Sequence, residues 1–425
     1  MVKRIVVTAW LVILSLPSLA QGAHEGARDV SLALNVGNDR AIAEMRRQGR
    51  LGADVERLVD AASRPDRKAM KDALAGCRAS GEAAGDAQDA ISCGLLLAGL
   101  GAADGDAPSW ASAWHWLRTS GMRLLTGGTG KGSLGKGFDD VDFASIEANA
   151  PKARFQFTSA TGRLALLPAD SHDARPHTLV TVGGKQVRAL VDTGAAATLI
   201  VPRHMASALS LDLIATGLTV IQHALPSLDR SNATEGWDGY ALADVTVGNL
   251  VAKDVLVLVT DRPLESVVIG NALLSMFGEV RFGGESIVVT QPGAAPGSCP
   301  AGVPMRFLPG QQFQGRFTIP AQLNGQNARL GIDSGGGPDL VVVGHAARHF
   351  SDAPRRTVDA TIGGMPATVE VGSVPLSLSV GTLQGQHVQA SVVQGQATNV
   401  DAILGAPLLI RNRAVLSFED GNACL

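Results

Sequence analysis

Aromatic residues and cysteines are scarce in this sequence, and neither sign of charge dominates it. Aromatic side chains make up 4% of the 425 residues, with a single tyrosine, and there are four cysteines. The formal net charge is −3, and the charges are mixed along the chain, which leaves no basic stripe for nucleic acid. Because no Cys-x-x-Cys pair or Cys/His cluster occurs, we also expect no metal site and no cofactor.

Long apolar runs are missing beyond the N-terminus. The chain opens with a basic stretch, Met1–Arg4, followed by an apolar run of 12 residues, Ile5–Leu16, and then by small residues. This pattern predicts a secretory signal peptide over 1–23, since so short a run cannot span a bilayer. An N-terminal core strand or anchor is the alternative. No later stretch reaches the length of a membrane span, so we expect a periplasmic or secreted protein without one.

Export to an oxidising compartment would favour disulfides between the four cysteines. Pairing within domains gives Cys77–Cys93 and Cys299–Cys424, although other pairings remain possible from the sequence. The second bridge would tie the linker between the two lobes to the C-terminus.

The region 24–125 has the apolar spacing of α-helices, near 3.6 residues, and predicts a small domain of αα-hairpins similar to helical repeats. Three tryptophans, Trp110, Trp114 and Trp116, lie close together in it. We expect them to pack a helix pair, while a groove for a protein partner is the alternative. The glycine-rich range 126–150 is predicted to be a linker, because it lacks the spacing of a phosphate-binding loop.

The remainder of the chain contains one pattern twice. An apolar strand ends in Asp192-Thr193-Gly194-Ala195, and another ends in Asp333-Ser334-Gly335-Gly336. Each is followed by an apolar run ending in glycine, at Gly270 and Gly405, which lie 78 and 72 residues after the aspartates. This repeat predicts two equivalent lobes, 151–295 and 296–425. We expect 155–157 and 164–167 to pair as the first strands, and each lobe to close with strands of its own.

The paired turns and their apolar-apolar-glycine partners resemble the two halves of an aspartic peptidase. The short lobes are more similar to tandem bacterial retropepsin-like domains than to the larger lobes of pepsin. The resemblance covers about 175–425 and implies a mainly β, two-lobed antiparallel fold, preceded by the small α-helical domain. It also implies that Asp192 and Asp333 are catalytic, supported by Thr193, Gly194, Ser334 and Gly335.

The resemblance further implies a flap over each half of the cleft. The segment Ile362-Gly363-Gly364-Met365 resembles the tip of a retropepsin flap. In the first lobe, Trp237 and Tyr240 lie near the end of the corresponding region, where either could line a substrate subsite or pack in the core. Ala195 and Gly336 stand where pepsin-like enzymes place a hydroxyl donor, which favours a less acidic working pH than theirs.

Two other motifs are weaker. The segment 331–338 superficially resembles a serine-protease motif but carries extra residues, and the repeat identifies the aspartate as its shared element. His345 and His349 have helical spacing but lack the glutamate of a zinc-peptidase helix.

The function that we predict is hydrolysis of peptide bonds by an exported aspartic endopeptidase, using a water activated between Asp192 and Asp333. Its substrate would be a peptide or unfolded protein, and the enzyme would be monomeric because one chain holds both aspartates. Two alternatives remain open. The chain could be an inactive peptide-binding or scaffold protein that uses the same cleft and recruits a partner through the helical domain, or that domain could be a removable prosegment.

Overall fold

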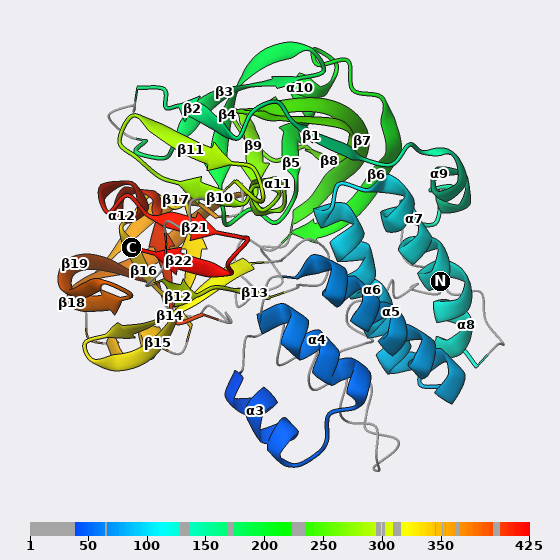
Figure 1. The fold of residues 1–425 in the computed structure, drawn as a ribbon, viewed down its shortest axis with the longest axis horizontal. Coiled ribbons are helices and arrows are strands. Elements are labelled where there is room, and N and C mark those ends of the chain that lie inside the picture. The colour runs from blue at the N-terminus through cyan, green and yellow to red at the C-terminus, as the bar shows by residue number, and fades with distance from the viewer. Residues whose placement is uncertain are drawn as a thin grey trace, which may run out of the picture.

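The computed structural model describes part of the chain, and the predicted signal peptide over 1–23 lies outside that part. The described residues are 39–63, 66–127, 137–168, 173–222, 234–294, 299, 302–308, 316–344, 346–350, 352, 354–362, 365–393 and 400–425. Within them, an N-terminal group of helices lies beside two β lobes (Figure 1). None of the helices in these ranges combines the length and hydropathy needed to cross a membrane.

The helices lie mainly in the first third of the chain. They are α3 (Asp39–Arg47), α4 (Ala53–Ser63), α5 (Arg67–Ala84), α6 (Ala87–Ala103), α7 (Ala107–Trp116), the π-helix η1 (Leu117–Gly121), α8 (Met122–Leu125) and α9 (Phe143–Asn149). Short connections fold α5, α6 and α7 back on one another, as the sequence predicts for αα-hairpins. Gly85 ends α5 in a left-handed conformation, and the Asp86 carboxylate then caps α6 by accepting the N–H groups of Gln88 and Asp89.

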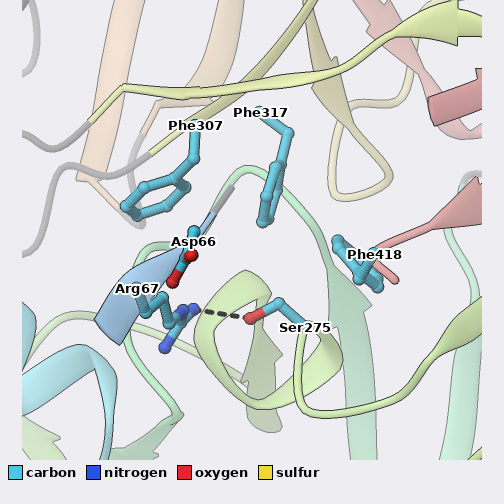
Figure 2. Close-up of a pocket in the computed structure, with 6 residues that line it drawn as sticks. All are labelled: Asp66, Arg67, Ser275, Phe307, Phe317 and Phe418. Atoms are coloured by element: carbon cyan, nitrogen blue, oxygen red, sulfur yellow. Dashed lines mark hydrogen bonds between the residues drawn. The ribbon is translucent and has the colours of Figure 1, made fainter. Parts of the chain in front are cut away.

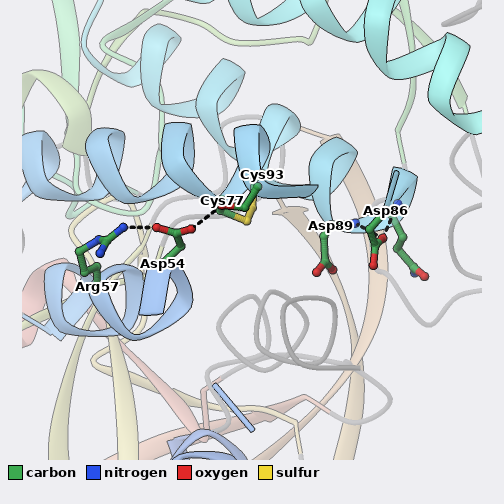
Figure 3. Close-up of a disulfide and its surroundings, with 8 residues drawn as sticks. Asp54, Arg57, Cys77, Asp86, Asp89 and Cys93 are labelled. Atoms are coloured by element: carbon green, nitrogen blue, oxygen red, sulfur yellow. Dashed lines mark hydrogen bonds and ion pairs between the residues drawn. A yellow bond between two sulfur atoms is a disulfide. The ribbon is translucent and has the colours of Figure 1, made fainter. Parts of the chain in front are cut away.

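A disulfide joins the first of these hairpins. Cys77 of α5 is bonded to Cys93 of α6, with the two Cα atoms 6.1 Å apart (Figure 3). Both cysteines are buried, so the bridge lies within the helix-helix contact. The predicted pairing of these two cysteines is confirmed.

Lobe 1 is a closed β-barrel. Its strands are β1 (Arg154–Phe157), β3 (His177–Val182), β4 (Lys185–Asp192), β5 (Leu199–Pro202), β6 (Leu213–Gln222), β7 (Thr234–Val247), β8 (Leu250–Thr260) and β9 (Val267–Gly270). The order is β1-β8-β5-β9-β4-β3-β7-β6, and because β7 also pairs with β8, six of the strands form a ring. The remaining two, β1 and β6, extend the ring at its edges. Two short helices, α10 (Arg203–Ala206) and α11 (Asn271–Leu274), follow β5 and β9.

Lobe 2 repeats this barrel. Its strands are β13 (Arg306–Leu308), β14 (Arg316–Leu323), β15 (Gln326–Asp333), β16 (Leu340–Val342), β17 (Arg355–Ile362), β18 (Met365–Val380), β19 (Leu383–Val393) and β20 (Ala402–Gly405). Here β14 pairs with β18 and closes a second ring of six strands. The 3-10 helix η3 (Ala346–Phe350) and helix α12 (Ala406–Arg411) complete the lobe. The predicted duplication is confirmed, with mainly antiparallel pairing and two parallel pairs in each lobe.

A third sheet joins the two lobes. Its order is β12-β22-β21-β10-β11-β2, formed from β2 (Thr161–Ala165), β10 (Glu279–Arg281), β11 (Ser286–Thr290), β12 (Val303–Pro304), β21 (Val415–Ser417) and β22 (Asn422–Cys424). The closing strands of the lobes therefore pair with each other, β10 with β21. The prediction that 155–157 pairs with 164–167 is wrong, because β1 joins β8 and β2 joins β11. Residue polarity does not distinguish these partners, since every strand involved is apolar on one face.

The second disulfide anchors this shared sheet. Cys299 is bonded to Cys424 of β22, with a Cα–Cα distance of 5.7 Å. The predicted pairing is confirmed here too, and the bridge closes a segment of 125 residues that contains most of lobe 2.

The predicted linker over 126–150 contains an ordered element. Residues 128–136 lie outside the described part, but α9 follows and packs against α7, where His115 Nδ1 lies 2.9 Å from a carboxylate oxygen of Glu147. A glycine-rich composition therefore describes only the first part of this range. The apolar residues Val141 and Phe143, both buried, mark where packed structure resumes.

Candidate active site

The two repeated turns have the same position in their barrels. Strand β4 ends at Asp192 and runs parallel to β9, with Asp192 opposite Gly270. Strand β15 ends at Asp333 and runs parallel to β20, with Asp333 opposite Gly405. The apolar-apolar-glycine motif is thus the strand that supports each aspartate, which explains why the two motifs recur together.

Glycine is required where these strands meet the loops that follow Asp192 and Asp333. A Cβ atom on Gly270 would overlap the carbonyl oxygen of Ala197, and one on Gly405 would overlap that of Pro338. The loops are also bonded to the strands at this point, because Gly270 N–H donates to Thr198 O over 3.1 Å and Gly405 N–H donates to Asp339 O over 3.0 Å. Each loop is therefore held against the strand that follows it.

The two carboxyl groups face one another across the lobe interface. A Cβ atom built on Gly194 would lie 2.5 Å from the carboxyl carbon of Asp333, and Gly335 has the same relation to Asp192. Each glycine therefore leaves the space that the opposite carboxyl group occupies.

A reciprocal pair of hydrogen bonds braces the turns. The backbone N–H of Thr193 donates to Ser334 Oγ over 3.0 Å, and the N–H of Ser334 donates to Thr193 Oγ1 over 2.9 Å. Ser334 Oγ also donates to the carbonyl of Val191 over 2.8 Å. Both hydroxyl residues are completely buried. The predicted cross-brace is thus present, and it joins the two lobes directly beneath the aspartates.

Replacing Ser334 with alanine should lower the free energy of unfolding by about 1–3 kcal/mol, because the buried N–H of Thr193 would lose its acceptor. Chemical denaturation would measure this change. Ser334→Thr is the matched control, since lobe 1 carries threonine at the equivalent position and the hydroxyl is retained. An unchanged denaturation midpoint for Ser334→Ala would contradict a bracing role.

The aspartates accept backbone hydrogen bonds in unequal number. Asp192 Oδ1 accepts the N–H of Gly194 over 2.7 Å and that of Ala195 over 3.1 Å, whereas Asp333 Oδ1 accepts the N–H of Gly335 over 3.0 Å. Burial, and next the negative charge of Asp333, raise the pKa of Asp192 to about 8. A pair of this kind retains a shared proton in the neutral range, and aspartic proteases are the well-known case of such sharing.

Asn271 supports the first turn and was not singled out from the sequence. It is completely buried, and its Nδ2 donates to the carbonyl of Thr193 over 3.2 Å, while its backbone N–H donates to Ala195 O over 2.7 Å. Lobe 2 has Ala406 at this position, so that only the backbone bond, to Gly336 O, is repeated there. Comparing the residue after each motif glycine would have revealed this polar side chain.

The structure describes the predicted flap and subsite residues only in part. Tyr240 is 4% exposed and packs against Trp110, so of the two roles left open for it by the sequence, the structure shows packing and not a subsite. Trp237 pairs with Thr219 between β6 and β7, but its side chain lies outside the described part. Ile362 and Met365 pair at the end of the β17–β18 hairpin, whereas Gly363 and Gly364 lie outside the described residues. The flap itself stays a prediction.

One cavity lies elsewhere, where the helices meet both lobes. It has a volume of about 210 Å³ and is lined by Asp66, Arg67, Ser275, Phe307, Phe317 and Phe418 (Figure 2). The two aspartates of the site are not among its lining residues. Within the described ranges, no three histidine, cysteine, aspartate or glutamate side chains are grouped as a metal site would require.

Two comparisons matched parts of this chain. A search of solved structures matched the crystal structure of a retropepsin-like aspartic protease from Rickettsia conorii, at 15% identity and a TM-score of 0.23, covering 33% of this chain and 94% of that one. A search of curated proteins found no match. Residues 178–276 match the family model described as "gag-polyprotein putative aspartyl protease". That match includes Asp192 and Gly270, and lobe 2 repeats their strand pairing at Asp333 and Gly405. The chain therefore contains a retropepsin-like aspartyl protease domain, built as two lobes.

Proposed function

We propose that this protein is an active aspartic endopeptidase, with Asp192 and Asp333 as its catalytic pair. The observation that carries the proposal is the direct approach of two carboxyl groups from equivalent turns, braced by a buried hydrogen-bond pair. The raised pKa of Asp192 supports it, because the chemistry needs one protonated and one ionised carboxyl group.

The reaction follows from this unequal protonation. A water bound between the carboxyl groups gives a proton to the ionised aspartate as its oxygen attacks the peptide carbonyl carbon. The protonated aspartate donates its proton to the carbonyl oxygen, which yields a neutral tetrahedral diol. That intermediate collapses when one hydroxyl returns its proton to a carboxylate and the amide nitrogen accepts a proton as the C–N bond breaks. The enzyme is regenerated with one proton shared between Asp192 and Asp333.

The substrate that we propose is an extended peptide or unfolded protein. The flap regions of the two lobes, β6–β7 and β17–β18, are antiparallel hairpins, and such strands can pair with the backbone of an extended peptide. Because both aspartates belong to one chain, a monomer would suffice for activity.

Cleavage of a diverse peptide library by the purified protein tests the proposal. Mass spectrometry should identify defined cuts that are absent with both Asp192→Asn and Asp333→Asn. If the folded wild-type protein cuts nothing but still binds peptides, the alternative of an inactive peptide-binding protein would replace this proposal.

Activity should extend into the neutral pH range. The lack of a hydroxyl donor at Ala195 and Gly336 and the raised pKa of Asp192 both favour a pair that keeps its shared proton to about pH 8. We expect kcat/KM to fall above that pH as the shared proton is lost. A pH–rate profile would measure this fall. A maximum near about pH 2, as in pepsin-like enzymes, would contradict this expectation.

We also propose that the protein is exported. The sequence pattern over 1–23 and the pairing of all four cysteines in disulfides support this location. Fusion of alkaline phosphatase to the C-terminus would test it in a bacterial host, since that reporter becomes active only after export. An inactive fusion of full length would argue for a cytoplasmic protein.

A further inference from the structure

The helices cover the outer face of the lobe 1 barrel. Trp110 of α7 is completely buried and lies 4.6 Å from the ring of Tyr240 on β7 and 5.4 Å from that of Phe143 on α9, measured between ring centroids. Leu256 and Leu258 of β8 belong to the same apolar cluster. Because side chains alternate along β7, Tyr240 points outward while Ala241 belongs to the barrel core.

The turn between α6 and α7 is bonded to the barrel itself. The backbone N–H of Leu256 donates to the carbonyl of Gly105 over 2.7 Å. Gly105 has a φ of +66°, and a Cβ atom there would lie 2.7 Å from Val255 Cγ1 and 3.3 Å from Thr198 Cγ2. The turn therefore fits against β8 and the start of β5 with no space for a side chain.

This contact lies next to the loop that carries Asp192. Thr198 Oγ1 donates to Leu256 O over 2.6 Å, and the backbone carbonyl of Thr198 accepts the N–H of Gly270. Ala197, in the same loop, belongs to the apolar cluster beneath the helices. Two successive contacts thus connect the helices to the strand that supports Asp192.

Lobe 2 provides an internal comparison, because its strands have the same register. Tyr240 lies opposite Leu258, and the equivalent pair in lobe 2 is Ser373 opposite Ser391. Leu242 lies opposite Leu256, and the equivalent pair is Pro375 opposite Gln389. The lobe 2 residues are exposed or half-buried, and Gln389 Nε2 donates to Ser373 Oγ over 2.6 Å.

The loops that follow the two aspartates also differ in polarity, and the lobe 2 loop is the more polar. Asp339 occupies the lobe 2 position of Thr198, and it forms an ion pair with Arg411 at 2.9 Å on a partly exposed surface. At these positions the face that the helices cover is therefore apolar in lobe 1, whereas the equivalent residues of lobe 2 are mostly polar and exposed or half-buried.

A single arginine connects the helices to both lobes. Arg67, at the start of α5, donates to Ser275 Oγ of lobe 1 over 2.5 Å and to the carbonyl of Ala103 over 3.0 Å. Its guanidinium carbon lies 5.6 Å from the ring centroid of Phe307 in lobe 2. It also forms an ion pair with Asp104, one residue before Gly105. Arg67 thus borders the cavity of Figure 2 as a contact among all three parts of the chain.

From these contacts we propose that the helical region is a permanent part of the catalytic unit and is not a removable prosegment. It packs against lobe 1 and keeps the Asp192 loop and the base of the lobe 1 flap in position. The part that concerns activity rests on the proposed peptidase function. Removing the helices would expose Tyr240, Leu256 and Leu258 together, an apolar patch that a mature soluble protein rarely presents. It would also release the backbone bond at Leu256.

The test is to cut the chain between the helices and the lobes without changing either. A recognition sequence for a site-specific protease is inserted within 128–136 of the full-length protein, which carries a C-terminal affinity tag. After cleavage, the immobilised lobes are washed, and the helical fragment that they retain is measured together with kcat/KM. Trp110→Ala is compared with Trp116→Ala. Trp116 packs within the helical region, where its Nε1 donates to Glu82 and Arg78 stacks on its ring.

We expect the cut wild-type protein and Trp116→Ala to retain the fragment and to keep kcat/KM within about twofold of their uncut forms. Trp110→Ala should release the fragment after cutting, with a loss of kcat/KM of about tenfold or more, because the catalytic loop and flap would lose their support. Release of the fragment from the wild-type protein, or an unchanged or higher kcat/KM after its release, would overturn the proposal. Retention is measured without peptide cleavage, so failure of the peptidase function would appear separately, as a docked fragment on lobes that cut no peptide.

Discussion

Replacing either Asp192 or Asp333 with asparagine is expected to lower kcat/KM by about 10³-fold or more, on any peptide that the wild-type protein cuts. Asparagine keeps the shape of the side chain but can neither accept the proton of the attacking water nor donate one from a carboxyl group. The double variant should be little worse than either single one, because the two groups act as a unit. Steady-state kinetics on one peptide from the library would measure these ratios.

A stability measurement separates this loss of activity from misfolding. The pKa of Asp192 is raised from 3.8 to about 8, so the folded state holds its proton more tightly than the unfolded state does. The wild-type protein should therefore lose stability as the pH rises between these values, while Asp192→Asn should not. By about pH 8 the free energy of unfolding of the variant should have risen by several kcal/mol relative to that of the wild type. Asp254→Asn is the matched control and should change neither activity nor this pH dependence, because Asp254 of β8 forms its ion pair with Arg154 of β1, away from the two aspartates. A residual kcat/KM above about a tenth of wild type in either dyad variant would exclude the proposed chemistry.

The second large effect is expected from the disulfide of the shared sheet. Replacing Cys299 and Cys424 together with serine should lower the free energy of unfolding by about 5 kcal/mol, because the bridge closes a loop of 125 residues in the unfolded chain. It also holds β22, which pairs with β21 and β12 at the end of the sheet. Urea unfolding in the absence of reductant would measure the change.

The other disulfide is the matched comparison within the same protein. Cys77 and Cys93 are only 16 residues apart, so replacing both with serine should cost about 3 kcal/mol on the same grounds. If replacing Cys77 and Cys93 lowered the free energy of unfolding by more than replacing Cys299 and Cys424, chain entropy would not be the main contribution of these bridges.

The repeated turns were predictable because their chemistry is local. A strand that ends in Asp-Thr-Gly or Asp-Ser-Gly, with a matching glycine motif downstream, predicts the same fold wherever it occurs, and the structure places both copies in the same barrel position. The cross-brace between Thr193 and Ser334 follows from the same symmetry. Asn271 is not predicted by the features that the two copies share, because lobe 2 has Ala406 at the equivalent position.

The errors concern contacts between segments that are distant in the sequence. Tyr240 could be placed near the base of a flap, but its side-chain direction depends on the register of β7, and the residue that covers it, Trp110, lies in another part of the chain. The same holds for β1 and β2, which pair with β8 and β11 and not with each other. Each is an apolar strand for which several partners are equally suitable by pattern alone.

By itself, the sequence determined the two aspartate turns, their duplication, the helical character of the first region and the pairing of its cysteines as one of several possibilities. These features depend on neighbouring residues and on spacings along one strand or helix. Only the tertiary structure decided that the closing strands of both lobes share a sheet, that the carboxyl groups of Asp192 and Asp333 meet, and that the helices cover the outer face of lobe 1 while also contacting lobe 2. Apolar periodicity shows that a face must be buried, but the shape of the opposing surface selects what buries it.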